Sequence, residues 1–182
     1  MNASTFDRIF PPAKKNFMRK KLPLPFLPFF LYHFAFAQMD IPPSGGNPRA
    51  KITEELGITD ITIQYSRPDV AGREGKIWGG LVSYGFSGTN FITNKNNSPW
   101  RAGANENTII SFEHDAKLEG KNVKAGAYGL HFAVWPDSVL LILSNQANAW
   151  GSFYYEEKDD ALRVTVKPVT QEKSTEWLKY EF

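Results

Sequence analysis

The sequence contains no cysteine among its 182 residues. The protein can therefore form no disulfide, bind no metal through thiolates and use no cysteine nucleophile. It also offers no cysteine for lipid attachment after processing of its N-terminus. A folded domain of this chain must be held together by its hydrophobic core.

Helical periodicity is missing as well, because no stretch of ten or more residues from Arg49 onward carries apolar side chains at helical spacing. Fourteen Gly and twelve Pro instead separate short alternating segments, which is typical of strands and turns. The length suits one domain. We expect a single all-β domain, an antiparallel β-sandwich of about seven short strands, with an open β-barrel as the alternative.

The sequence also lacks an apolar run long enough for a membrane helix. The longest run, Leu22 to Phe36, is interrupted by three prolines and is shorter than the roughly 20 residues that cross a bilayer. It is preceded by a basic cluster, and at its end lies Ala35-Phe36-Ala37, the small-x-small pattern of a signal peptidase site. We therefore predict a secretory leader in residues 1–37, cleaved after Ala37, with Met18 as an alternative start. The protein is expected to be exported, periplasmic or secreted, with no integral membrane segment after cleavage.

Removal of the leader changes the charge balance. The whole chain has 21 basic and 19 acidic residues, but residues 1–37 hold six of the basic ones and one of the acidic ones. The remainder has 15 basic and 18 acidic residues, a net charge of −3. Nucleic-acid binding depends on a positive surface, so we expect no nucleic-acid partner.

We expect residues 38–48 to be a flexible tether and residues 49–182 to be the domain. The first two strands form a hairpin with its turn at 57–60. Predicted irregular structure fills 70–103, and a short helical turn lies within 145–155. The predicted strands span residues 50–56, 61–65, 108–114, 128–135, 139–143, 162–166 and 175–182.

Five segments in this order resemble the exported bacterial proteins grouped as domain of unknown function 2911: Ile61 to Pro68, Trp78 to Val82, Trp100 to Thr108, Ala125 to His131 and Trp150 to Phe153. The similarity runs from about Arg49 to the end of the chain. It implies export and a β-rich domain, but the family has no established activity or catalytic residues to carry over. It also implies a further strand beyond Phe182, so we expect the last strand to be missing and one sheet edge to be exposed.

Known catalytic patterns are absent, and we expect no cofactor. Metal binding would need convergent ligands, yet the only histidines are His33, His114 and His131. Glu113 and His114 are adjacent on a predicted strand and so point to opposite faces. We therefore expect no metal site.

Arg67, Arg101, Glu106 and His131 form the predicted binding set. Both arginines lie where regular structure meets an irregular segment, and a turn can bring Glu106 back to Arg101. His131 shares a strand face with Gly129 and Ala133, whose small size leaves space beside the imidazole. A purely structural interpretation is that the arginines bind backbone carbonyls and Glu106 and fix the long loop.

Trp135 completes the binding candidates, because its position opposite the apolar face of its strand favours exposure and stacking on a ligand. Two functions fit this set. The first is a non-catalytic module that binds a small molecule, a glycan or a protein. The second is a hydrolase in which His131 is the general base and Arg67 or Arg101 stabilises an anion.

In a bacterial host that secretes the protein, we expect it to lose residues 1–37 and to begin at Gln38, because cleavage follows the second small residue of the site. Intact-mass spectrometry of the exported protein measures this directly. The double variant Ala35→Leu, Ala37→Leu should retain the leader. An exported wild-type protein that still carries Ala37 would contradict the prediction.

Overall fold

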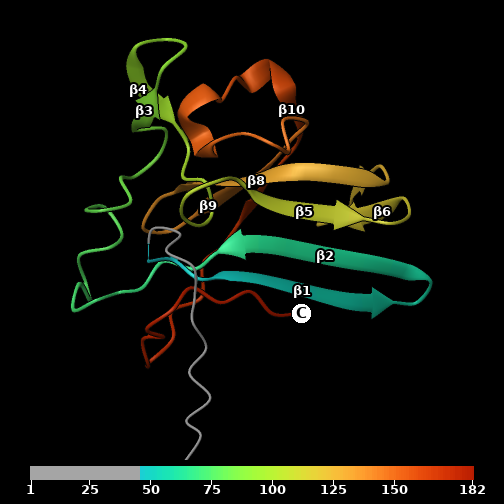
Figure 1. Ribbon diagram of the computed structural model, residues 1–182, viewed down its shortest axis with the longest axis horizontal. Coiled ribbons are helices and arrows are strands. Elements are labelled where there is room, and N and C mark those ends of the chain that lie inside the picture. Colours follow the sequence, from blue (N-terminus) through green and yellow to red (C-terminus); the bar gives the residue numbers. More distant parts are fainter. Residues whose placement is uncertain (1–45) are drawn as a thin grey trace, which may run out of the picture. The chain divides into compact units, whose positions relative to one another are not determined.

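The computed structural model describes residues 46–182, and ten strands lie in this part of the chain. Six of them form one antiparallel sheet in the order β1 (Arg49–Leu56), β2 (Thr59–Ser66), β5 (Thr108–Phe112), β8 (Gly126–Val134), β9 (Val139–Ser144) and β10 (Asp160–Val166) (Figure 1). Its edge strands β1 and β10 do not pair, so the sheet does not close into a barrel. The predicted antiparallel all-β fold is confirmed, and a sandwich-like arrangement fits it.

The predicted leader and its predicted cleavage site lie outside the described residues, as does most of the predicted tether. Among residues 46–182, no helix combines the length and the apolar character that a membrane span requires.

One face of the sheet carries the main hydrophobic core. The register places Ile63 opposite Ile110 and Ile110 opposite Tyr128, so apolar side chains of neighbouring strands form continuous rows. A small hairpin of β6 (Ala116–Leu118) and β7 (Lys121–Val123) packs against this core, together with Leu178 and Tyr180 from the C-terminal segment. The buried cluster comprises Ile63, Tyr65, Ala102, Ile110, Phe112, Val123, Tyr128, Leu130 and Leu143.

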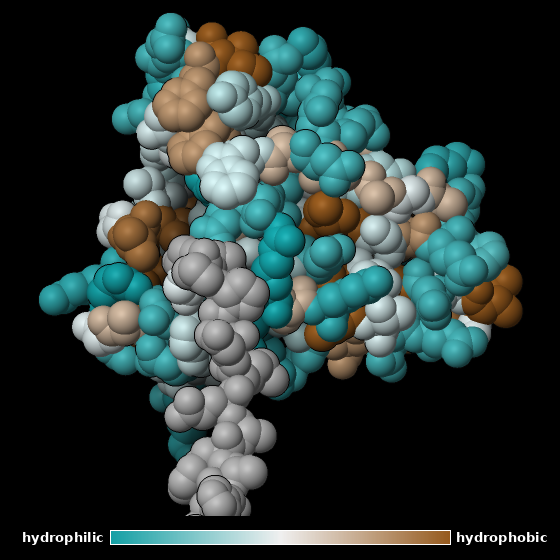
Figure 2. Space-filling view, in the orientation of Figure 1, coloured by the Kyte–Doolittle hydropathy of each residue, from teal (hydrophilic) through white to brown (hydrophobic). Residues whose placement is uncertain are grey.

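The opposite face is buried over β8 and β9, where His131, Ala133, Ile142 and Ser144 are each at most 2% exposed. Two short 3-10 helices, η1 (Gly151–Tyr154) and η2 (Glu157–Asp159), lie near it. Beside η1 lies a second small hairpin of β3 (Gly88–Asn90) and β4 (Lys95–Ser98) (Figure 1). The hydrophobic residues visible on the molecular surface form separate small patches among hydrophilic ones (Figure 2).

Several predicted elements need correction. The first hairpin turns through Gly57 and Ile58 alone, with Gly57 at φ +71°, so β2 begins at Thr59. The segment predicted as irregular at 70–103 contains β3 and β4, whose mostly polar residues give little strand signal. The helical turn predicted within 145–155, in contrast, is present as η1.

The strand predicted at 175–182 does not form. Trp177 makes one isolated bridge to Asp69, and Leu178 N–H donates to the Pro68 carbonyl over 3.0 Å. The apolar residues of this segment pack against the core instead of extending the sheet. Strand-like composition cannot distinguish these two uses, because both need extended backbone with bulky side chains.

Tyr180 should be the main anchor of the C-terminal segment. Its hydroxyl donates to the Ala102 carbonyl over 2.6 Å, and its ring meets Tyr65 edge-on at 4.7 Å. We expect Tyr180→Ala to lower the free energy of unfolding by about 3 kcal/mol or more, and Tyr180→Phe by about 1 kcal/mol. Urea titration measures both, with Phe182→Ala, at a 53% exposed position, as a near-neutral control. Equal losses in Tyr180→Ala and Phe182→Ala would contradict this role.

Candidate functional site

The segment from Trp100 to Thr108 connects the two faces of the sheet. Trp100 and Phe132 exchange two backbone hydrogen bonds of 2.8 Å, which fix the segment alongside β8. Ala102 is fully buried in the core at φ +54°, and its carbonyl accepts hydrogen bonds from Thr108 Oγ1 and the Tyr180 hydroxyl. Its neighbour Arg101 extends instead toward η1. The backbone course thus determines where the Arg101 side chain lies.

Arg101 is a partly buried cation packed against η1. Its Cζ lies 4.4 Å from the centre of the Phe153 ring, a cation–π contact. Gly151 has φ +62°, and a Cβ atom there would overlap the guanidinium, so glycine is needed at this position. Arg101 Nη1 donates to the Asn105 carbonyl over 2.6 Å, but no carboxylate of residues 46–182 pairs with Arg101. Burial lowers the pKa of Arg101, yet an arginine remains charged.

His131 lies behind η1 and is only 2% exposed. Its Nδ1 and the Ser152 Oγ are 2.8 Å apart and share a hydrogen bond, and its ring meets Tyr155 at 5.6 Å. Burial, and then the nearby charge of Arg101, lowers the pKa of His131 to about 4. The imidazole is therefore neutral at neutral pH.

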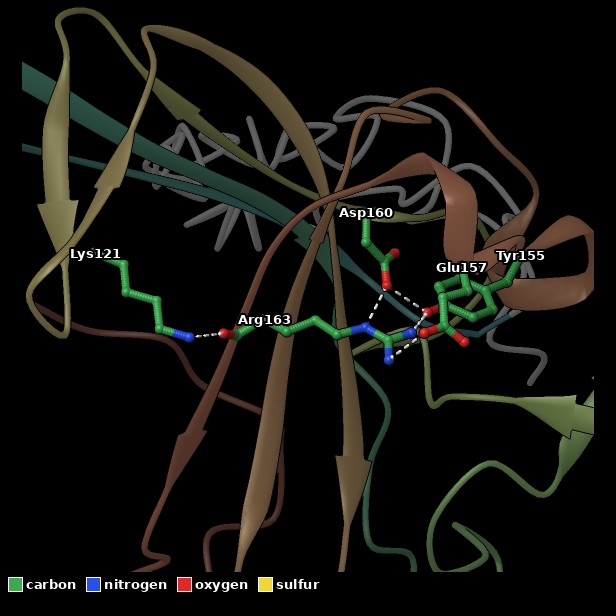
Figure 3. Close-up of polar contacts among 5 residues, drawn as sticks. All are labelled: Lys121, Tyr155, Glu157, Asp160 and Arg163. Atoms are coloured by element: carbon green, nitrogen blue, oxygen red, sulfur yellow. Dashed lines mark hydrogen bonds and ion pairs between the residues drawn. The ribbon is translucent and has the colours of Figure 1, made fainter.

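Tyr155 is held by a polar network at the start of β10 (Figure 3). Its hydroxyl donates to Asp160 Oδ2 and accepts a hydrogen bond from Arg163 Nη2, both over 2.7 Å. Arg163 also donates to Asp160 over 2.6 Å and pairs with Glu157 at 2.9 Å. Burial raises the pKa of both Tyr155 and Asp160, so the phenol remains protonated and fixed in place beside His131.

A cavity of about 170 Å³ lies between the long irregular segment and η1. Arg101 and Ser152 line it, and so does Ser98, which is 1% exposed and whose Oγ has no hydrogen-bond partner within residues 46–182. No carboxylate lines this cavity. Its remaining lining comprises Leu81, Val82, Ser83, Gly88, Thr89, Pro99, Trp100 and Phe153. A guanidinium and hydroxyls without a nearby carboxylate favour an anionic ligand.

A larger cavity, of about 470 Å³, lies over β2 and β5. The chain segment that leads into η1 forms part of the wall of both cavities. Ala147 to Trp150 line the larger cavity, whereas Ser152 and Phe153 line the smaller one. Glu106 and Asn107 contribute to the larger cavity, where Glu106 pairs with Arg49. Its remaining lining comprises Gln64, Tyr65, Ser66 and Ile109.

The five predicted binding residues do not converge on one site. Arg101 and His131 are brought together on either side of the Gly151-Ser152 backbone. Glu106 was expected to return to Arg101, but Arg101 binds the Asn105 carbonyl instead, and Glu106 lies in the other cavity. Arg67 Nε donates to the Leu178 carbonyl over 2.8 Å, and Trp135 packs against Phe86 at the end of β8. Neither Arg67 nor Trp135 lines a described cavity.

The space predicted beside His131 is filled by protein. Gly129 and Ala133 do leave room, but Ser152 and Tyr155 occupy the side of the imidazole that a ligand would need. His131 lines neither described cavity, and no carboxylate of residues 46–182 is hydrogen-bonded to it. Within residues 46–182, His131 therefore reaches a cavity only through its hydrogen bond to Ser152 and has no carboxylate that orients it.

Sequence reasoning missed most polar residues of the two cavities, among them Ser98, Asn107 and Ser152. Asn107 and Ser152 lie inside segments that carried the family resemblance, but nothing in the sequence shows that their side chains face a cavity. No group of three or more potential metal ligands is present in residues 46–182.

A family model described as "Protein of unknown function (DUF2911)" matches residues 47–182, well over half of the chain. The resemblance predicted from the five segments is thereby confirmed. No curated protein and no solved structure matches the chain. Both cavities lie entirely within the matched range.

Because the pKa of His131 is about 4 in the folded protein and about 6.5 in an unfolded chain, the unfolded state takes up this proton first as the pH falls. The free energy of unfolding should therefore decrease from about pH 6.5 to pH 4, with a total His131 contribution of about 3 kcal/mol. Urea midpoints measured across this range should fall less steeply for His131→Gln. His114→Gln, which removes a half-exposed imidazole, is the control variant. Identical slopes for wild type and His131→Gln would refute the prediction.

Proposed function

We propose that this chain, which belongs to the DUF2911 family of proteins of unknown function, is an exported domain that binds a small organic acid at Arg101. The family supplies no activity to transfer, so the proposal rests on the cavity itself. Export is supported by the basic cluster, the apolar run and the Ala35-Phe36-Ala37 site.

The observation that carries the proposal is the missing counter-ion of Arg101. Burying a cation without a paired charge costs free energy, and a bound carboxylate would offset that cost. Only Nη1 of the guanidinium donates to an acceptor within residues 46–182, so Nε and Nη2 have no hydrogen-bond partner there. An arginine fork matches the two oxygens of a carboxylate.

The size and lining of the cavity narrow the ligand class. About 170 Å³ is below the roughly 300 Å³ at which drug-sized pockets begin, so the ligand is a compact acid. The lining also includes the hydroxyl-bearing side chains of Ser83 and Thr89, and Ser152 can donate to a ligand oxygen when His131 Nδ1 is the donor in their shared hydrogen bond. Leu81, Val82 and Pro99 provide an apolar wall for a short carbon chain.

The Ser152–His131 hydrogen bond favours one alternative, a serine-dependent hydrolase with Arg101 stabilising the oxyanion. A histidine with a pKa of about 4 is a poor base near neutral pH, and no carboxylate orients it. We therefore favour binding over hydrolysis. Covalent labelling of Ser152 by a fluorophosphonate, lost in Ser152→Ala, would instead support the hydrolase.

Acid binding at Arg101 can be tested directly by measuring thermal unfolding at fixed ionic strength with acetate, succinate or citrate present. We expect at least one of them to raise the thermal unfolding midpoint by a few degrees, because a ligand that binds only the folded state stabilises it. Arg101→Gln should abolish the shift. Arg73→Gln is the matched control, since Arg73 is exposed, pairs with Asp69 and lies outside both cavities.

An NMR titration of the His131 ring gives a second readout that does not depend on stability. An acid bound at Arg101 should neutralise its charge and raise the pKa of His131 above about 4. Equal midpoint shifts in Arg101→Gln and Arg73→Gln, with no change in the His131 titration, would overturn the proposal.

A further inference from the structure

We infer that the larger cavity, over β2 and β5, is a separate binding site for a neutral saccharide. It uses different side chains from the Arg101 site and lies on the other side of the segment that leads into η1. Saccharide binding in the larger cavity is therefore independent of acid binding at Arg101.

Asn107 provides the first observation that points to a ligand. It is 6% exposed and lines the cavity, and its Nδ2 donates to the carbonyls of Gln146 and Ala147. These two bonds fix the amide, but its Oδ1 has no donor within residues 46–182. A buried amide oxygen without a partner costs free energy, and because Oδ1 is itself closed off from solvent, a ligand hydroxyl would recover that cost only after a local opening of the lining.

The charge of the cavity favours a neutral ligand. Arg49 and Glu106 form an ion pair in its lining, so their charges cancel locally. The Glu106 backbone N–H, and then Arg49, lower the pKa of the Glu106 carboxyl, which keeps the pair ionised near neutral pH. Gln64 and Ser66 add donors and acceptors of moderate strength. Such a mixture of donors and acceptors without net charge suits a polyhydroxylated molecule.

Trp150 supplies an aromatic surface beside these polar groups. It lines the cavity, is 55% exposed and makes no ring contact with another aromatic side chain of residues 46–182. An indole offers a large apolar face, and the C–H faces of a sugar ring can pack on it while the hydroxyls reach polar neighbours. A cavity of about 470 Å³ lies within the range of roughly 300–1,000 Å³ typical of small-molecule sites.

The sheet topology argues against an extended peptide as the ligand. Peptides commonly bind by adding a strand to a free sheet edge. The cavity lies over β2 and β5, and both are internal strands paired on each side, β2 with β1 and β5, and β5 with β2 and β8. Neither strand has a free edge for an incoming strand.

An array of neutral mono- and oligosaccharides, followed by calorimetric titration of the strongest binder, tests the site. We expect Trp150→Ala to weaken binding about tenfold or more, since ring stacking contributes strongly to such sites. Gln64→Ala should weaken it several-fold, and the NMR signals of the Asn107 side-chain amide should shift on binding. Trp135→Ala is the matched control, because Trp135 is also partly exposed but lies outside the cavity.

Arg101→Gln separates this inference from acid binding, because it should abolish the acid-induced midpoint shift and leave saccharide affinity unchanged. Three results would overturn the inference: no saccharide binding at millimolar concentration, full affinity in Trp150→Ala, or a loss confined to Trp135→Ala. Circular dichroism of each variant confirms that the comparison is made between folded proteins.

Discussion

Trp100 exchanges two backbone hydrogen bonds with Phe132, and the arrangement of both cavities depends on this pairing. It holds the chain beside β8 just before the turn that leads into β5. That turn then places Ala102 in the core, Arg101 against η1, and Glu106 and Asn107 over β2 and β5. Gly103 supports the same geometry, because a side chain there would collide with Thr108 Oγ1 and the Ser66 carbonyl. One short turn thereby distributes neighbouring residues among the core and two separate cavities.

The segment from Trp150 to Phe153 completes both cavities, and each of its residues has a different contact. Trp150 lines the larger cavity, while Gly151 provides the space that the Arg101 guanidinium needs. Ser152 binds His131 and lines the smaller cavity. Phe153 lies against Arg101 and stacks on Phe91 at 4.8 Å, which links η1 to the β3–β4 hairpin. The segment thus acts as the wall between the two cavities.

Local patterns were sufficient to predict the main sheet but not the cavities. The alternation of Ile61, Ile63 and Tyr65 identifies the core face of β2, because strand side chains alternate in a fixed way. The smallest hairpins and the path of the C-terminal segment depend on contacts between distant residues, such as Trp177 with Asp69. Arg101 and His131 were identified from the sequence as members of one predicted binding set. Their separation from Glu106 was not predictable, because it depends on which partner, Arg49 or Arg101, the folded turn brings to that carboxylate.

The arginines of the two cavities differ in burial and in pairing, and the two proposed ligands follow from this difference. Arg49 and Glu106 are both substantially exposed, so water screens their ion pair and the pair contributes little to stability. Their charges nevertheless cancel, so the proposed saccharide site depends on hydrogen bonding and on the Trp150 surface. Arg101 lies deeper and has no carboxylate partner within the described part of the chain, so its field is less screened and extends to His131. The same residue type thus favours a neutral ligand in one cavity and an anion in the other.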